Sequence, residues 1–128
     1  MNLLLDTHCL IYLLEGSDKL PEKIKTAIFS KENNKAISVI SLFEIAIKSN
    51  IKKLKLSLTI EQIELMLLTT GIDIIPVKTS HLQYLSSNQF YHKDPFDKLI
   101  LSTAVVDEYI LLSKDKEFAS YNIPVLWN

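Results

Sequence analysis

Arginine is absent from this 128-residue sequence, and all 14 cationic side chains are lysines. The planar fork that reads guanine or clamps phosphate in a bidentate manner is therefore missing. Acidic residues number 15, so the net charge is −1 and no global positive charge attracts a polyanion. A lysine cluster (Lys48, Lys52, Lys53 and Lys55) is more typical of a solvated helix end than of a phosphate-binding track.

Cysteine, glycine and long apolar runs are also scarce. The single cysteine, Cys9, excludes an intramolecular disulfide and a cysteine-rich zinc site, and is best interpreted as a small core residue. Two glycines cannot form a glycine-rich phosphate loop, and no Gly-x-Ser-x-Gly elbow indicates a serine hydrolase. Apolar runs are far shorter than the roughly 20 residues that cross a bilayer, and no secretory pattern opens the chain. We therefore expect a cytoplasmic protein with no membrane segment.

Apolar residues make up 48% of the chain, which is enough for a continuous core, so we expect a single domain over residues 1–128. The hydrophobic pattern predicts alternating strands and helices. Strands are expected at residues 2–5, 35–40, 72–77, 109–113 and 124–127, and helices at 7–14, 21–32, 41–51, 59–70, 79–86 and 94–108. This order predicts an α/β fold with a mainly parallel central sheet and helices on both faces.

Acidic residues interrupt this apolar pattern at four places. Asp6 ends the first strand, and Asp115 follows the strand at 109–113. Glu44 lies among apolar residues, where an unpaired charge is costly, and Asp97 lies in the first turn of the helix that Asp94 begins. Ligands of an open parallel sheet bind beyond the carboxyl ends of its strands. Four carboxylates gathered there would repel each other unless a hard cation such as Mg²⁺ or Mn²⁺ neutralised them.

Each acid also has a structural interpretation. Asp6 and Asp115 suit the N-caps of the helices that follow them, and Glu44 would complete a capping box with Ser41. Asp97 would stabilise a helix dipole, and Asp94 is more typical of a cap than of a ligand. Capping and metal binding use the same edge of the sheet, so both interpretations stay open.

Hydroxyl and imidazole groups add less. Thr7 and Ser113 are candidates for hydrogen bonds that orient Asp6 and Asp115, although ordinary turn hydrogen bonds explain them equally well. His8, His81 and His92 are not spaced as a zinc site, and each is more typical of a packing or surface histidine.

Four segments together resemble the conserved blocks of PIN-domain proteins, and in particular the VapC-type toxins of bacterial toxin-antitoxin pairs. They are residues 3–8 (LLLDTH), 38–45 (SVISLFEI), 92–100 (HKDPFDKLI) and 112–118 (LSKDKEF), and the likeness continues into residues 123–127. The four occur in order over nearly the whole chain. That order makes the resemblance specific, although no single segment is decisive.

The resemblance implies a PIN fold and a Mg²⁺- or Mn²⁺-dependent endoribonuclease that hydrolyses RNA. Its metal would be bound by the matching acids, Asp6, Glu44, Asp97 and Asp115. It further implies a homodimer that a small antitoxin inhibits by inserting into the active-site groove. Lys114 and Lys98 depart from the asparagine and arginine common at their positions, which affects substrate preference and removes no carboxylate.

Other functions are compatible with the same residues. One is a PIN nuclease of RNA maturation or DNA processing without a toxin role. Another is a non-catalytic binding module whose acids act only as caps. A haloacid-type phosphatase is disfavoured, because the segment after Asp6 lacks a second aspartate.

Overall fold

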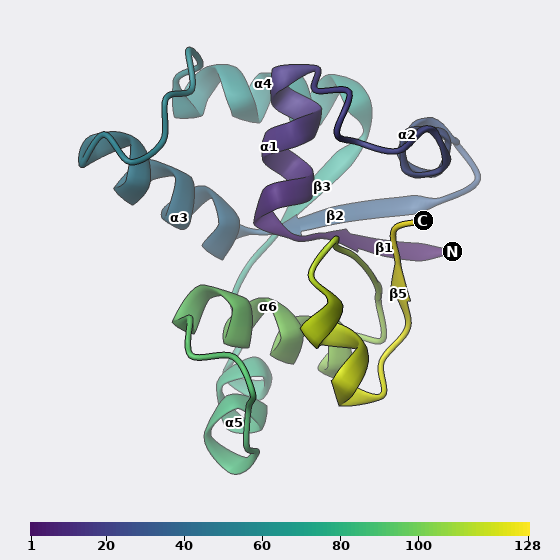
Figure 1. Cartoon of the computed structure of the whole chain (residues 1–128), viewed down its shortest axis with the longest axis vertical. Helices are drawn as coiled ribbons and strands as arrows, with labels where there is room; N and C mark the ends of the chain where they lie inside the picture. Colours follow the sequence, from purple (N-terminus) through teal and green to yellow (C-terminus); the bar gives the residue numbers. More distant parts are fainter.

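Five parallel strands form one sheet in this computed structural model, which describes residues 1–128. The strands are β1 (Asn2–Leu5), β2 (Asn34–Ser38), β3 (Ile72–Ile75), β4 (Ile110–Leu112) and β5 (Val125–Leu126). Their order is β3-β2-β1-β4-β5, and every neighbouring pair is parallel (Figure 1). The chain therefore builds outward from β1 to β3 and then returns to the other side of β1. The order reverses between β1 and β4, which is where ligands bind in sheets of this kind.

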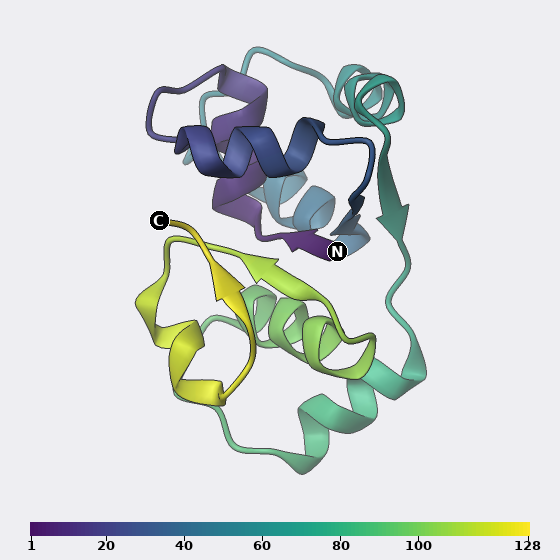
Figure 2. The same cartoon turned by 90° about the vertical axis from the view of Figure 1, so that its right-hand side faces the viewer.

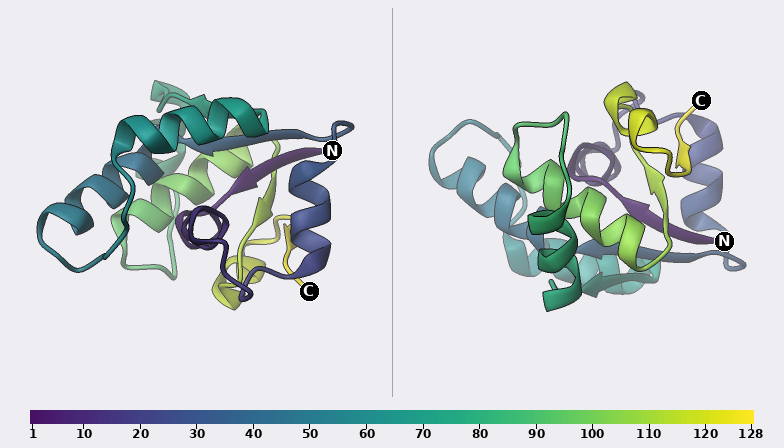
Figure 3. Two further views of the ribbon diagram at one scale, coloured as in Figure 1. Left: turned by 90° about the horizontal axis from the view of Figure 1, so that it is seen from above. Right: turned by 90° about the horizontal axis from the view of Figure 1, so that it is seen from below.

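Helices cover both faces of the sheet, as the sequence predicts. They are α1 (Thr7–Glu15), α2 (Glu22–Phe29), α3 (Val39–Asn50), α4 (Ile60–Thr70), α5 (Thr79–Ser87), α6 (Pro95–Val106) and the 3-10 helix η1 (Lys116–Tyr121). Figure 2 shows α1, α2 and α4 on one side of the sheet and α5, α6 and η1 on the other. In Figure 3, the first group lies nearer the viewer when the molecule is seen from above, and the second group lies nearer when it is seen from below. α3 contacts both α1 and α6. None of these helices combines the length and the apolar character needed to span a membrane.

Alternate residues of the strands pack into two separate cores. Leu3 and Leu5 of β1 face the core beneath α1, α2 and α4, whereas Leu4 faces the core beneath α6 and η1. Such alternation follows from the period of a strand, whose successive side chains point to opposite faces. Cys9 is fully buried in the first core, as predicted, and burial raises the pKa of its thiol well above the ordinary value.

The junction of β2 and α3 differs from the sequence-based expectation. β2 ends at Ser38, and the Ser38 hydroxyl accepts a 3.1 Å hydrogen bond from the backbone N–H of Ile40 as the N-cap of α3. The β-branched Val39 and Ile40 suggested a longer strand, but the serine cap begins the helix before them. The predicted capping box of Ser41 and Glu44 is therefore wrong. Glu44 lies within the helix and has no capping role.

The other predicted caps are present. Asp6 caps α1, Asp94 caps α6, and Asp115 caps η1, each through a side-chain oxygen that accepts a backbone N–H. Thr59 and Gln62 form a capping box at the start of α4. The N-caps of α1 and η1 thus lie at the carboxyl edge of the sheet. Asp6 and Asp115 therefore cap helices at the same edge of the sheet where a ligand would bind.

Candidate functional site

Three predicted acids line one cleft at the carboxyl edge of the sheet. Asp6 follows β1 and Asp115 follows β4, and these two strands are direct neighbours. Asp97 reaches the same cleft from the first turn of α6. The cleft has a volume of about 440 Å³ and is lined by Asp6, His8, Asp97, Lys114, Asp115 and Lys116. The fold therefore brings together residues that are more than 100 positions apart in the sequence.

Both carboxylate oxygens of Asp6 are held by hydrogen bonds. Oδ1 accepts from the backbone N–H of Cys9 at 2.8 Å, and Oδ2 accepts from the Ser113 hydroxyl at 2.5 Å. The Ser113 oxygen in turn accepts from the backbone N–H of Asp115 at 3.0 Å, so one serine links the Asp6 carboxylate to the backbone of Asp115. Thr7 instead donates to Ser41 at 3.0 Å, and no hydrogen bond links it to the acids. Burial raises the pKa of Asp6, although the bonds from Ser113 and Cys9 oppose the shift.

Glu44 is buried and only half satisfied. Its Oε2 accepts from the Lys48 ammonium at 2.5 Å, whereas its Oε1 is buried without any hydrogen-bond partner. An ionised oxygen in this state is costly unless another positive group faces it. Lys48 is therefore paired with Glu44, and the charges of Asp94 and Asp97 also act on it. Lys52 and Lys53 are exposed just past α3, as expected for a solvated helix end.

Asp97 lies in an unfavourable electrostatic environment for a carboxylate. Burial, followed by the neighbouring charge of Asp94, raises the pKa of Asp97 to about 7. Glu44 and Asp6 raise it further, and His92 lowers it. Glu44 is therefore close enough to act on Asp97 electrostatically, although it is not among the residues lining the cleft. Asp94 keeps Oδ1 on the backbone N–H groups of Phe96 and Asp97, at 2.8 and 3.3 Å, in its capping role.

His92 is buried, as the packing interpretation predicts, but it also contacts a predicted site residue, Asp115. It is 5% exposed, and its Nε2 lies 2.8 Å from Oδ2 of Asp115 and 3.6 Å from Oε2 of Glu117. The available signal was its position at the start of the segment 92–100, two residues before the Asp94 cap. His8 lines the cleft from an exposed position, and His81 is buried elsewhere, against Asp107.

The donor set fits a hard divalent cation. Asp6, Asp97 and Asp115 offer carboxylate oxygens to one cleft, and Glu44 adds a buried oxygen that lacks a partner. Mg²⁺ and Mn²⁺ prefer oxygen ligands of this kind. A cation among these acids would also relieve the repulsion that raises the pKa of Asp97.

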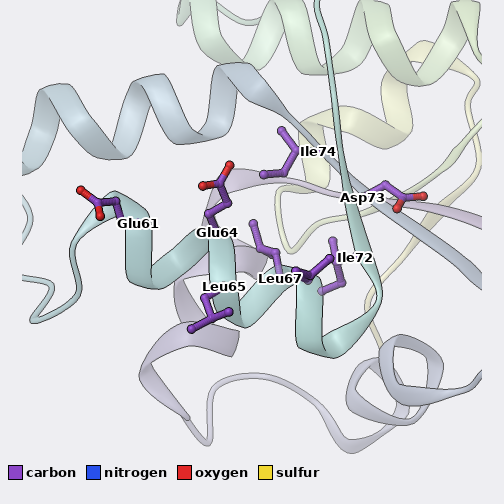
Figure 4. A pocket seen from close by; sticks show the side chains of 8 residues that line it. Glu61, Glu64, Leu65, Leu67, Ile72, Asp73 and Ile74 are labelled. Carbon is purple, nitrogen blue, oxygen red and sulfur yellow. The ribbon is translucent and has the colours of Figure 1, made fainter.

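A larger hollow lies away from the acids, between α4 and the edge strand β3. Its volume is about 550 Å³, and Figure 4 shows side chains from both elements around it. The lining consists of Glu61, Glu64, Leu65, Leu67, Leu68, Ile72, Asp73 and Ile74. Leu65 and Leu68 are 63% and 76% exposed, so apolar surface continues along α4. Exposed apolar patches of this kind are typical of binding surfaces. None of the four predicted site residues lines this hollow.

The fold and the site define an α/β protein that gathers acidic side chains at the carboxyl edge of a parallel sheet, where the strand order reverses. The PIN domain family model matches residues 3–124, and the chain belongs to the PIN domain family. The family and the fold predicted from the four segments are both confirmed. Membership of this family supports a hydrolase that acts on nucleic acid.

Solved structures share this fold over nearly the whole chain. A chain of VapBC2 from Rickettsia felis, bound to a DNA fragment from its promoter, has a TM-score of 0.68 and 22% identity, with 100% of both chains covered. A toxin-antitoxin complex from Klebsiella pneumoniae gives 0.64 and 27% identity, covering 96% of this chain and 94% of that one. VapBC-1 from nontypeable Haemophilus influenzae has a TM-score of 0.65 and 18% identity, with 98% of this chain and 97% of that chain covered. A comparison with curated protein sequences found no significant match.

Proposed function

We propose that this protein is a Mg²⁺- or Mn²⁺-dependent endoribonuclease and the toxin of a toxin-antitoxin pair. One observation carries the proposal: acids from separate parts of the chain gather at the point of a PIN-domain sheet where the strand order reverses. The similar chains from Rickettsia felis, Klebsiella pneumoniae and Haemophilus influenzae come from VapBC or toxin-antitoxin structures, which supports the same role here.

The proposed ligands are Asp6, Asp97 and Asp115, with Glu44 completing or orienting the set. When bound, the metal supplies an activated water and offsets the charge of the phosphodiester transition state. The chain supplies the geometry. Ser113 orients Asp6 through its hydroxyl, and the Asp94 cap fixes the first turn of α6, from which Asp97 projects.

We expect the purified protein to cleave RNA only when Mg²⁺ or Mn²⁺ is added, because its cleft offers hard oxygen donors. The assay is cleavage of total cellular RNA with mapping of the new ends, with each metal and with a chelator. Cleavage that persists in the chelator would contradict the metal mechanism. Cleavage of DNA instead would favour a processing nuclease, and no cleavage of either polymer would favour a binding module.

Lysines on the cleft are the proposed contacts to RNA phosphates. Lys116 is exposed and lines the cleft, so Lys116→Gln should raise the KM about two- to fivefold, as for the loss of one phosphate contact, with little change in kcat. The slope of log KM against log salt should fall by about 0.7, the value per phosphate for a single strand. Lys53→Gln is the matched control, because Lys53 is also exposed but does not line the cleft. Equal effects of the two substitutions would exclude a specific role for Lys116.

The proposed partner is a small antitoxin, and the proposed assembly is a homodimer of one domain over residues 1–128. An acidic cleft attracts a basic side chain, and exposed apolar side chains on α4 suit a partner's apolar residues. We expect co-expression with an antitoxin encoded beside the toxin to give a stable complex with suppressed RNA cleavage. The measurement is cleavage by the purified complex before and after the antitoxin is removed. Full activity within the intact complex would contradict this arrangement.

A further inference from the structure

Three hydrogen-bonding groups converge on the phenolic oxygen of Tyr121. The backbone N–H of Tyr91 donates to it at 2.7 Å, and the backbone N–H of His92 donates at 2.9 Å. The third group, Nδ1 of the His92 ring, lies 2.8 Å away. On its other side, the same ring places Nε2 2.8 Å from Oδ2 of Asp115.

These contacts determine which ring nitrogen carries the proton. The Tyr121 oxygen already accepts two N–H donors, so its remaining hydrogen-bonding capacity is its own O–H. That O–H is donated to Nδ1 of His92, which must therefore be an unprotonated acceptor. The ring proton then resides on Nε2 and is donated to Asp115. The proton positions follow from the network of acceptors and donors.

The ring has little freedom to leave this orientation. It is 5% exposed and stacks on Phe118 and Tyr121, with centroid distances of 4.3 and 5.5 Å. Asp115 is also held at its second oxygen, where Oδ1 accepts the backbone N–H of Glu117 at 2.9 Å. Both oxygens of Asp115 are thus fixed, in the same way as both oxygens of Asp6.

We propose that His92 is a positioning residue, which acts through a Tyr121–His92–Asp115 hydrogen-bond chain to orient Asp115 for a divalent cation. The inference rests on the proposed metal-dependent function. Groups that hold metal ligands from outside typically account for 10- to 100-fold in metal affinity. His92 has this role because its protonated Nε2 keeps one lone pair of Oδ2 occupied and leaves the remaining lone pairs of Asp115 in a fixed direction.

A different arrangement would have His92, Asp115 and Glu117 bind a metal directly. Their ligand atoms lie within 4.8 Å of one another. Metal binding at Nε2 would require the ring proton to move to Nδ1, which faces a Tyr121 oxygen that already accepts two N–H groups. The hydrogen-bond network therefore favours a positioning role over metal ligation. The two arrangements differ in which ring nitrogen of His92 carries the proton.

Nitrogen NMR of the His92 ring tests the proton directly, with the full chain and with Mg²⁺ as the probe. We expect the Nε2–H tautomer without metal, and we expect its Nε2–H signal to persist at saturating Mg²⁺. An Nδ1–H tautomer, or loss of the Nε2–H signal on adding Mg²⁺, would overturn the proposal. Tyr121→Phe should make the Nδ1–H tautomer detectable, because the donor to Nδ1 is removed.

Two amide variants separate positioning from packing. His92→Asn can still accept the Tyr121 O–H but is too short to reach Asp115, whereas His92→Gln places an amide N–H near the former Nε2. Both lose the same ring stacking, so thermal melts should show similar stability costs. We expect Mn²⁺ affinity, measured by calorimetry without RNA, to fall about 10- to 100-fold in the Asn variant and to recover most of that loss in the Gln variant. Wild-type affinity in the Asn variant, or equal losses in both, would overturn the positioning role. Because no RNA is used, absence of RNA cleavage by the wild type would contradict the proposed function and leave this result interpretable.

Discussion

Replacement of Asp97 with asparagine should stabilise the metal-free protein while it abolishes cleavage. Burial and the charge of Asp94 raise the pKa of Asp97 to about 7, so its ionised form is disfavoured in the fold at neutral pH. At about 1.4 kcal/mol per pKa unit, discounted for partial exposure, the gain in the free energy of unfolding should be about 1–2 kcal/mol. Cleavage should fall by more than about 100-fold, because even the outer contacts of metal ligands account for 10- to 100-fold.

The same shift predicts a pH dependence of stability. The unfolded chain titrates Asp97 near the ordinary value of 3.8, whereas the folded chain titrates it near 7. Between these values the folded state binds more protons, so the free energy of unfolding of the metal-free protein should fall as the pH rises from about 4 to 7. Urea unfolding in a chelator at several pH values measures this slope. The slope should shrink in Asp97→Asn and persist in Asp73→Asn, a control at an exposed acid; an identical slope in all three proteins would contradict the assignment.

Asp6→Asn separates capping from metal binding. Asparagine and aspartate cap helices about equally well, so the bond to the Cys9 N–H can persist and the metal-free protein should keep its stability or gain some. Mn²⁺ should raise the melting temperature of the wild type by mass action, and this rise should shrink or vanish in Asp6→Asn and Asp97→Asn. Thermal melts run beside the cleavage assay decide the question. Full cleavage and a full Mn²⁺-induced shift in both variants would show that these acids act only as caps.

The sequence was informative where local chemistry and strand period agree. Apolar runs that alternate with amphipathic segments predicted the parallel sheet, and Asp94 as a cap predicted the start of α6. The parallel sheet then implied that Asp6 and Asp115 lie at the same edge. They do so because β1 and β4 are parallel neighbours and each acid follows the end of its strand. The sequence pattern did not determine the start of α3, since Val39 and Ile40 favour a strand and only the Ser38 cap opposes them.

His92 and Lys48 could not be assigned from local pattern. The partners of His92 are Tyr121 and Asp115, which lie 29 and 23 residues away and become neighbours only when η1 packs beside α6. The partner of Lys48 is one helical turn away at Glu44, which is an ordinary surface spacing. That spacing becomes significant only because the fold buries Glu44, and burial depends on the whole sheet and both helix layers.

Lys48→Met should destabilise the metal-free protein and enlarge its response to Mn²⁺. The hydrogen bond to Glu44 raises the pKa of Lys48, so the ammonium is charged and balances a carboxylate whose side chain is only 4% exposed. Methionine keeps much of the side chain's apolar volume but removes the charge, which leaves Glu44 without any hydrogen-bond partner. Breaking a buried pair costs about 3–5 kcal/mol, and the 35% exposure of Lys48 reduces the expected loss to about 1–3 kcal/mol.

The matched control is Lys48→Met combined with Glu44→Gln, which removes both charges and should recover most of the stability. If Glu44 faces the bound ion, Mn²⁺ takes over the role of the missing ammonium, so the metal-induced rise in melting temperature should be larger in Lys48→Met than in the wild type. The double variant should lack this extra rise, because it has no Glu44 charge to neutralise. Thermal melts at a series of Mn²⁺ concentrations measure all three proteins under the same conditions. Equal Mn²⁺-induced shifts in the wild type and Lys48→Met would show that the bound metal does not interact with Glu44. The unpaired Oε1 of Glu44 would then only destabilise the fold and would not be a metal ligand.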